Sequence, residues 1–153
     1  MSNFPIYPNG TTIRNLIYNS LQRQQHIMGL IKDTDEVPAW VLMLVSRASS
    51  DMNAVEEFIN YYYQPQQAMA GWAASENMRE TSLDHFKKMY HSGQMVRSLL
   101  YNAHFRQTGI LSKVKDDMQV PPWVIFLVSR ATNDFNCVSD YLNYEIARNA
   151  GKI

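Results

Sequence analysis

An internal duplication is the feature that most constrains how this chain folds. The stretch VPAWVLMLVSRASSDMN starts at Val37, and the similar stretch VPPWVIFLVSRATNDFN starts at Val120. The offset of 83 (120 − 37 = 83) aligns the two copies without a gap, and about half of the positions from Arg14 to Tyr61 are identical. Because two copies are too few for a solenoid, in which three or more repeats stack, we predict a tandem pair whose copies pack face to face.

Each copy begins with the pattern of an amphipathic helix. From roughly Thr12 to Ile31, apolar residues recur at steps of three and four, the period of a helix with one buried face. Polar residues 32–35 then interrupt the pattern, and Pro38 follows. Proline suits a helix start because it needs no hydrogen-bond donor there, so a second helix is predicted from this point.

The second helix of each copy is predicted to run to about Tyr62 and its counterpart. Trp40 and Trp123 stand at the start of its apolar stripe, and both are predicted to be core anchors. Short polar residues at 49–51 favour a kink or a split in the helix, because their side chains compete with the helix for hydrogen bonds to backbone groups. The stripe stays in phase across them, so a single helix is favoured.

These patterns predict an all-α fold, in which a tandem duplicated helical hairpin forms a four-helix bundle with pseudo-twofold symmetry. A short linker helix is predicted between the copies, with Ser82 as its cap. The expected organisation is an extended N-terminal arm (1–10), a first hairpin repeat (11–63), a linker with a short helix (64–92) and a second hairpin repeat (93–148).

Composition limits the classes of function. The 153 residues are 46% hydrophobic and 18% charged, which suits a packed core, and the formal net charge is 0. A chain without excess positive charge lacks the electrostatic signature of a nucleic-acid binder. No apolar run approaches the roughly 18 residues that span a bilayer, and no secretion signal is recognisable. We therefore expect a soluble protein that uses neither nucleic acid nor a membrane.

The single cysteine, Cys137, cannot form an internal disulfide. It aligns with Ala54 of the first copy, so it is predicted to be a small buried apolar residue. The absence of cysteine pairs also fits a reducing compartment.

Two Arg–Asp pairs recur at equivalent positions: Arg47 with Asp51, and Arg130 with Asp134. A spacing of four residues places both members on one helix face, so structural ion pairs along each helix are predicted. The alternative is a duplicated polar site that also includes Arg14 and Arg97. Neither arrangement contains a nucleophile or a group that titrates near neutral pH, so acid–base catalysis is not expected.

No pattern points to a metal or cofactor. The four histidines (His26, His85, His91 and His104) show no HxxxH or HExxH spacing, and none aligns with a histidine in the other copy. Glycine-rich phosphate-binding motifs and the GxSxG motif are also absent from the sequence. We therefore predict a protein without catalytic residues, metal or cofactor that is not an enzyme.

Two apolar segments outside the repeats are candidate interfaces. The arm carries Phe4, Ile6 and Tyr7 between two prolines, and a stiff segment loses less entropy when it docks on another subunit. The linker carries Met69 and Trp72. The partner is expected to be a protein, either a second copy of the chain or another protein. The alternative is that both segments cover the ends of the chain's own bundle.

The stretch PPWVIFLVSRATNDFNCVSDYLNYE resembles a pattern found in small helical proteins of tailed bacteriophages. In that pattern a proline precedes Trp-Val, and a small residue, a valine and Asp-Tyr follow at set spacings. The matching residues are Pro122, Trp123, Val124, Val128, Ala131, Val138, Asp140 and Tyr141. The first copy has Glu57-Phe58 in place of Asp-Tyr, and Leu44 and Leu127 stand where the pattern usually has lysine.

This resemblance implies a bacteriophage protein that acts through protein contacts, as a structural or accessory component of the virion. Its expected location is the virion or the host cytoplasm. Two alternatives remain open from the sequence. One is a small phage inhibitor that binds a host protein, and the other is a helical-bundle enzyme or ligand-binding protein with a pocket between the hairpins.

Overall fold

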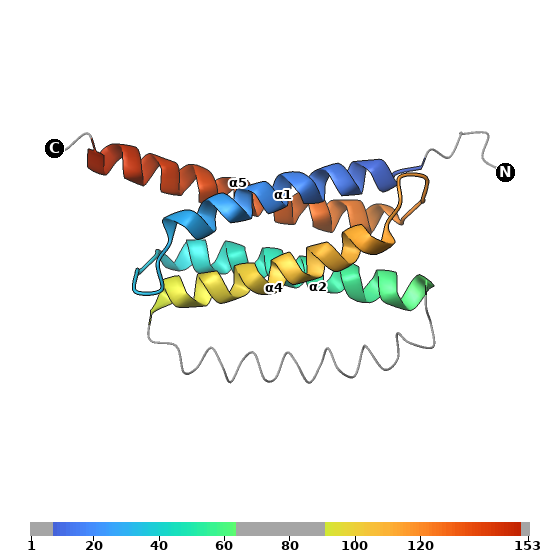
Figure 1. Cartoon of the computed structure of the whole chain (residues 1–153), viewed down its shortest axis with the longest axis horizontal. Coiled ribbons are helices and arrows are strands. Elements are labelled where there is room, and N and C mark those ends of the chain that lie inside the picture. The colour runs from blue at the N-terminus through green and yellow to red at the C-terminus, as the bar shows by residue number, and fades with distance from the viewer. Residues whose placement is uncertain (1–7, 64–90, 151–153) are drawn as a thin grey trace.

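The computed structural model describes residues 8–63 and 91–150, and within these ranges the chain is a four-helix bundle without strands. The helices are α1 (Gly10–Leu30), α2 (Ala39–Tyr63), α4 (Ser92–Lys113) and α5 (Pro122–Ala150) (Figure 1). The predicted all-α bundle is confirmed. Both second helices run unbroken, so the apolar stripe, rather than the polar residues at 49–51, determined the local structure.

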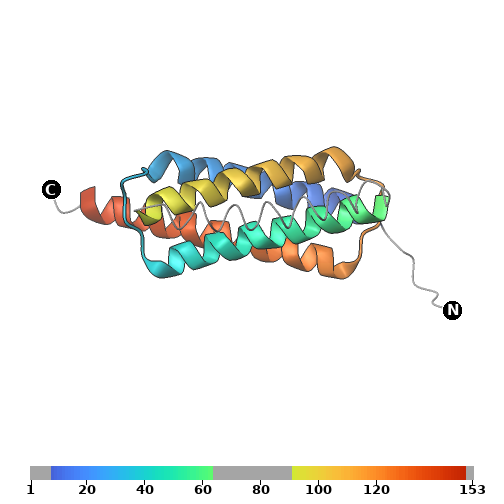
Figure 2. The ribbon, with the colours of Figure 1, turned by 90° about the horizontal axis from the view of Figure 1, so that it is seen from below.

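The helices form two layers, with α1 beside α5 in one and α2 beside α4 in the other (Figure 1). Contacts between layers join α2 to α5 and α1 to α4, as the view from below shows (Figure 2). The two helices of one repeat therefore lie at diagonal corners of the bundle. Each repeat is a hairpin in its connectivity, but its helices pack against the helices of the other repeat.

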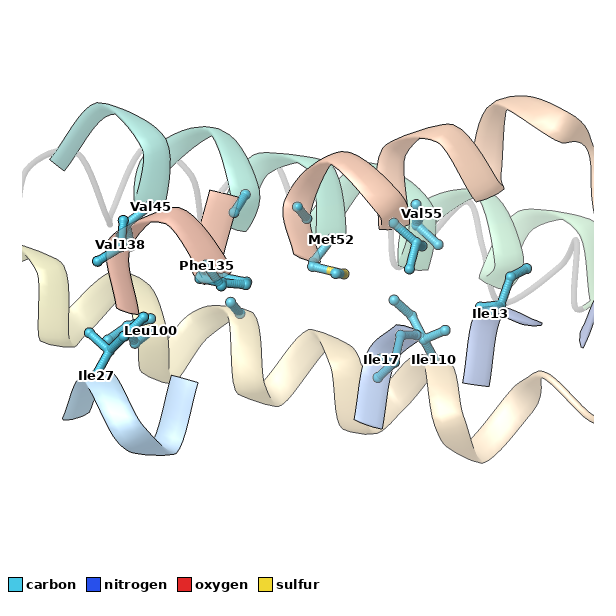
Figure 3. Close-up of a cluster of buried hydrophobic side chains, with 14 of the residues drawn as sticks. Ile13, Ile17, Ile27, Val45, Met52, Val55, Leu100, Ile110, Phe135 and Val138 are labelled. Atoms are coloured by element: carbon cyan, nitrogen blue, oxygen red, sulfur yellow. The ribbon is translucent and has the colours of Figure 1, made fainter. Parts of the chain in front are cut away.

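The hydrophobic core fills the space between the repeats (Figure 3). Its largest side chain, Phe135 of α5, occupies the position equivalent to Met52 of α2, and both are fully buried. The residues around them are mostly aliphatic and come from all four helices; they include Ile13, Ile17, Ile27, Val45, Val55, Leu100, Ile110 and Val138. A pocket between the hairpins, as one alternative requires, would have to open among these side chains.

The prediction that the two tryptophans are core anchors is wrong. Trp40 is 39% exposed and Trp123 is 43% exposed, whereas the next residue in each helix, Val41 or Val124, is fully buried. Each residue turns the helix by about 100°, so only one of two neighbours can face the core. The valine takes that position in both repeats, and the indole lies at the edge of the bundle.

The prediction that Cys137 is buried is also wrong, because its side chain is exposed. The adjacent Val138 and the preceding Asp134 point inward, and Cys137 falls on the outer side of α5 between them. In the described part of the chain, no helix is both long and apolar enough to cross a membrane.

Each inter-helix loop packs against the start of the other repeat's first helix. The Gly10 amide donates to the Met118 carbonyl (2.9 Å), and the Gly93 amide donates to the Asp35 carbonyl (2.8 Å). A Cβ atom at Gly93 would approach the Asp35 oxygen to 2.6 Å, and one at Gly10 would overlap the Lys115 oxygen. Glycine is needed at both positions because the opposing backbone leaves no room for a side chain.

Candidate functional site

The four charged residues predicted to pair along each helix form ion pairs across the two repeats instead. Arg47 of α2 donates from Nε and Nη2 to the two carboxylate oxygens of Asp134 in α5, at 2.9 and 2.6 Å. Arg130 of α5 binds Asp51 of α2 in the same way, at 2.9 and 2.7 Å. The i, i+4 spacing brought the residues to one face, but antiparallel packing of α2 on α5 decides which carboxylate each guanidinium binds.

This Arg–Asp quartet (Arg47, Asp51, Arg130 and Asp134) lies on the central line between α2 and α5. Both carboxylates are buried, whereas both guanidinium groups keep part of their surface in contact with solvent. The hydrogen bonds from Arg47 to Asp134 raise the pKa of Arg47, and those from Arg130 to Asp51 raise the pKa of Arg130. Bidentate pairing satisfies both buried carboxylates, so the quartet holds α2 against α5.

An aromatic pair lies at each end of the quartet. Trp40 of α2 meets Tyr141 of α5 edge to face, with ring centroids 4.8 Å apart, and Phe58 meets Trp123 in the same geometry at 4.8 Å. These two pairs are equivalent under the offset of 83. The tryptophans predicted to be core anchors therefore join α2 to α5 at the surface of the bundle.

Most of the exposed large apolar side chains in the described ranges occur in matching pairs, one from each repeat; Tyr62, Phe105 and Ile146 are the exceptions. These pairs are Tyr18 with Tyr101, Trp40 with Trp123, Met43 with Phe126, and Tyr61 with Tyr144. Three of the four pairs belong to α2 and α5. Met43 and Tyr61 are 18 residues apart, which is five helical turns, so they share one outward side of α2, as Phe126 and Tyr144 share one side of α5. We name these last four residues the aromatic face.

Two further arginines, Arg14 and Arg97, bind the ends of helices. Arg97 Nη1 donates to the carbonyls of Met28 and Ile31, both at 2.7 Å, at the C-terminal end of α1. Arg14 does the same at the end of α4, reaching the carbonyls of Leu111 and Val114 at 2.7 Å. Both arginines bind backbone carbonyls at helix ends, whereas Arg47 and Arg130 bind carboxylates between α2 and α5. A single polar site shared by all these arginines is therefore not formed.

Sequence reasoning missed a second set of polar contacts, which is not duplicated. Arg106 of α4 and Glu56 of α2 form a buried ion pair at 2.8 Å, and Gln107 donates to Ser20 at 2.6 Å. The equivalent positions are Arg23 with Ser139, and Gln24 with Ala103, and neither can form the same pair. The sequence holds one signal of these contacts. Arg106 and Gln107 have identical residues in the first copy, whereas their partners Glu56 and Ser20 have none in the second copy.

The predicted interface residues Phe4, Ile6, Tyr7, Met69 and Trp72, and the linker helix predicted to begin at Ser82, lie outside the described residues. The histidines within the described ranges are dispersed. His26 bonds Asn143 at 2.7 Å, and His91 bonds Glu36 at 2.6 Å. The hydrogen bonds from His91 and Ser92 lower the pKa of the exposed Glu36 carboxyl. Residues 8–63 and 91–150 contain no group of three or more acidic, histidine or cysteine side chains suited to a metal.

The fold and this site define a class: an internally duplicated four-helix bundle with an inter-repeat arginine–aspartate quartet and paired aromatic residues on its surface. Comparison of the chain with protein-family models, with curated proteins and with solved structures gives no match. The interpretation of the site therefore depends on its own geometry.

Proposed function

We propose that this protein acts through contacts with other proteins, without catalysis, as a structural or accessory component of a bacteriophage particle. The observation that carries the proposal is the aromatic face, formed by Met43, Tyr61, Phe126 and Tyr144. All four side chains are more than half exposed, and each has an exposed apolar counterpart at the equivalent position of the other repeat. Aromatic residues and methionine are also enriched at protein interfaces.

The rigid surroundings of Phe126 support its use in binding a partner. Phe126 lies beside the Arg130 guanidinium, with 5.5 Å between the ring centroid and Cζ. Arg130 is itself held by Asp51, so the ring stands next to a fixed cation on a rigid helix. A rigid surface loses little conformational entropy on binding. The phage assignment is supported by the sequence resemblance of the second helix.

The test uses particles of the phage that encodes the chain, with Phe126→Ser/Tyr144→Ser as the test variant and Asn133→Ser as the control. All three positions are exposed on α5, so the folded state should tolerate each change. We expect quantitative mass spectrometry to find the parent and the control in purified particles, and the test variant reduced at least tenfold.

Melting temperatures measured by circular dichroism check that the variant remains folded. Absence of the parent protein from purified particles would contradict the virion assignment. If the parent instead copurifies in a fixed ratio with one host protein, the phage-inhibitor alternative is the correct one. Equal incorporation of the test variant and the control would show that the aromatic face is not the contact surface.

A further inference from the structure

The core of this protein is an interface between two repeats, and neither repeat has a core of its own. The helices that pack together are α2 with α4, α2 with α5, α1 with α5 and α1 with α4, so every one of these pairs joins one repeat to the other. The Arg–Asp quartet and the arginine caps also join the repeats. The bundle therefore resembles a dimer in which each subunit is one pair of helices, except that both pairs belong to one chain.

The covalent connection between the repeats must run the length of the bundle. Asn102 of α4 bonds Ser49 of α2 at 2.9 Å, and Arg106 bonds Glu56, so α4 runs parallel to α2 with an offset of about 50 residues. His91 then lies level with the start of α2, about 22 residues before Tyr63, which corresponds to roughly 33 Å at 1.5 Å per residue. About ten extended residues can span that distance, and residues 64–90 supply 27 (90 − 64 + 1).

The contacts that break the symmetry determine which repeats can pair. If the second repeat paired with another second repeat, Arg106 would face Ser139 and Gln107 would face Ala103. The buried guanidinium would then lack its carboxylate, which is costly. If the first repeat paired with another first repeat, Arg23 and Gln24 would take the places of Arg106 and Gln107, but His26 would replace Gly109, where a Cβ atom would overlap the Glu56 carboxylate. These contacts favour the pairing of a first repeat with a second repeat, most clearly over the pairing of two second repeats.

We propose that the inter-repeat interface also accepts a second copy of this chain, so that two chains exchange repeats and form a dimer of two complete bundles. The first repeat of each chain packs on the second repeat of the other through the same core, quartet and Glu56–Arg106 pair. The length of the connection decides whether the chain forms a closed monomer or the exchanged dimer. A connection that spans the bundle lets the chain close on itself at an effective concentration in the millimolar range. A shorter connection leaves exchange as the only way to bury the core.

The main test replaces residues 64–90 with five Gly/Ser residues, which reach at most about 18 Å. The matched control replaces the same segment with 27 Gly/Ser residues, so that both variants lack the native linker and differ only in length. We expect light scattering to give twice the chain mass for the short variant and a single chain mass for the control, with equal helical content by circular dichroism. A folded, monomeric short variant would overturn the proposal.

A second experiment on a full-length chain applies if the short variant does not fold. A protease site is placed in the middle of the 64–90 segment, and the protein is unfolded and refolded at millimolar concentration. We expect a fraction of the protein to be dimeric. After cleavage its mass should fall to that of one bundle, because each bundle then consists of the first repeat of one chain and the second repeat of the other. A dimer that keeps its mass after cleavage is held by surface contacts. That outcome, like the complete absence of a dimer, would overturn the proposal.

Discussion

At the ends of the bundle, the backbone of the other repeat comes so close that it limits the size of the side chain at single positions. Gly10 and Gly93 are equivalent, and each lies in the first turn of the first helix of its repeat, against the loop of the other repeat. Neither glycine needs an unusual backbone conformation, because no described glycine has a positive φ. The absence of a side chain, rather than freedom of the backbone, is therefore what each position requires.

Substitution of these glycines tests that argument at the level of one atom. Gly93→Ala places a methyl group against the Asp35 and Lys32 carbonyls, and the loop must move, so we expect a loss of about 1–3 kcal/mol in the free energy of unfolding. Gly29→Ala is the matched control, since it is exposed in α1 with no atom within 4 Å of the new Cβ. It should stabilise the protein by up to about 0.5–1 kcal/mol. Urea denaturation measures both, and equal effects would refute the steric explanation.

Individual helices are joined to the other repeat at their C-terminal ends by arginine. The last carbonyls of a helix have no partner within it, and α1 and α4 each end where a charged donor from the other repeat reaches them. The same arginines also face an aspartate of the adjoining loop. Arg97 Nε lies 3.1 Å from Asp33, and Arg14 Nε lies 3.5 Å from Asp116. Each arginine thus fixes the end of a helix and the loop that follows it.

Removal of one cap should destabilise the whole bundle. Arg97→Met keeps the aliphatic stem but leaves the Met28 and Ile31 carbonyls without their charged donor, and we expect a loss of about 1.5–3 kcal/mol in unfolding free energy. Arg23→Met on the exposed side of α1 is the control and should change stability by less than about 0.5 kcal/mol. Guanidinium denaturation gives both values. A cap variant as stable as the control would show that water replaces the arginine without cost.

The whole molecule should unfold as one unit, because within residues 8–63 and 91–150 each repeat packs mainly against the other. Loss of either repeat exposes the core residues of both, so no folded half can remain. Two-state unfolding is common for single domains of this size. Here it has a specific structural cause, namely the diagonal placement of the two helices of each repeat.

Tryptophan fluorescence can follow the two ends of the interface between α2 and α5 separately. In Trp72→Phe/Trp123→Phe only Trp40 remains, packed on Tyr141, and in Trp40→Phe/Trp72→Phe only Trp123 remains, packed on Phe58. Within each variant, we expect the fluorescence midpoint to coincide with the circular dichroism midpoint. Separate midpoints in either variant would mean that the interface between α2 and α5 opens before the helices unfold, and would refute unfolding as one unit.

The local pattern of the sequence was enough to predict the elements. The period of the apolar residues and Pro38 place α1 and α2 within one or two residues of their observed ends, and the offset of 83 transfers the prediction to α4 and α5. It also identified the Arg–Asp quartet residues, because they repeat. These results follow from interactions between residues that are near one another in the chain, for which the helical period is sufficient information.

Tertiary structure alone decided which helices pack together and which residues bind. A helical stripe shows that a residue lies near the core but not which helix it faces. The sequence therefore could not reveal that Arg47 binds Asp134 rather than Asp51, or that Val41 rather than Trp40 reaches the centre. The Glu56–Arg106 pair joins positions 50 residues apart, and only Arg106 has an identical residue in the other copy. Such contacts depend on the diagonal arrangement of the repeats, which is settled by the packing of all four helices together.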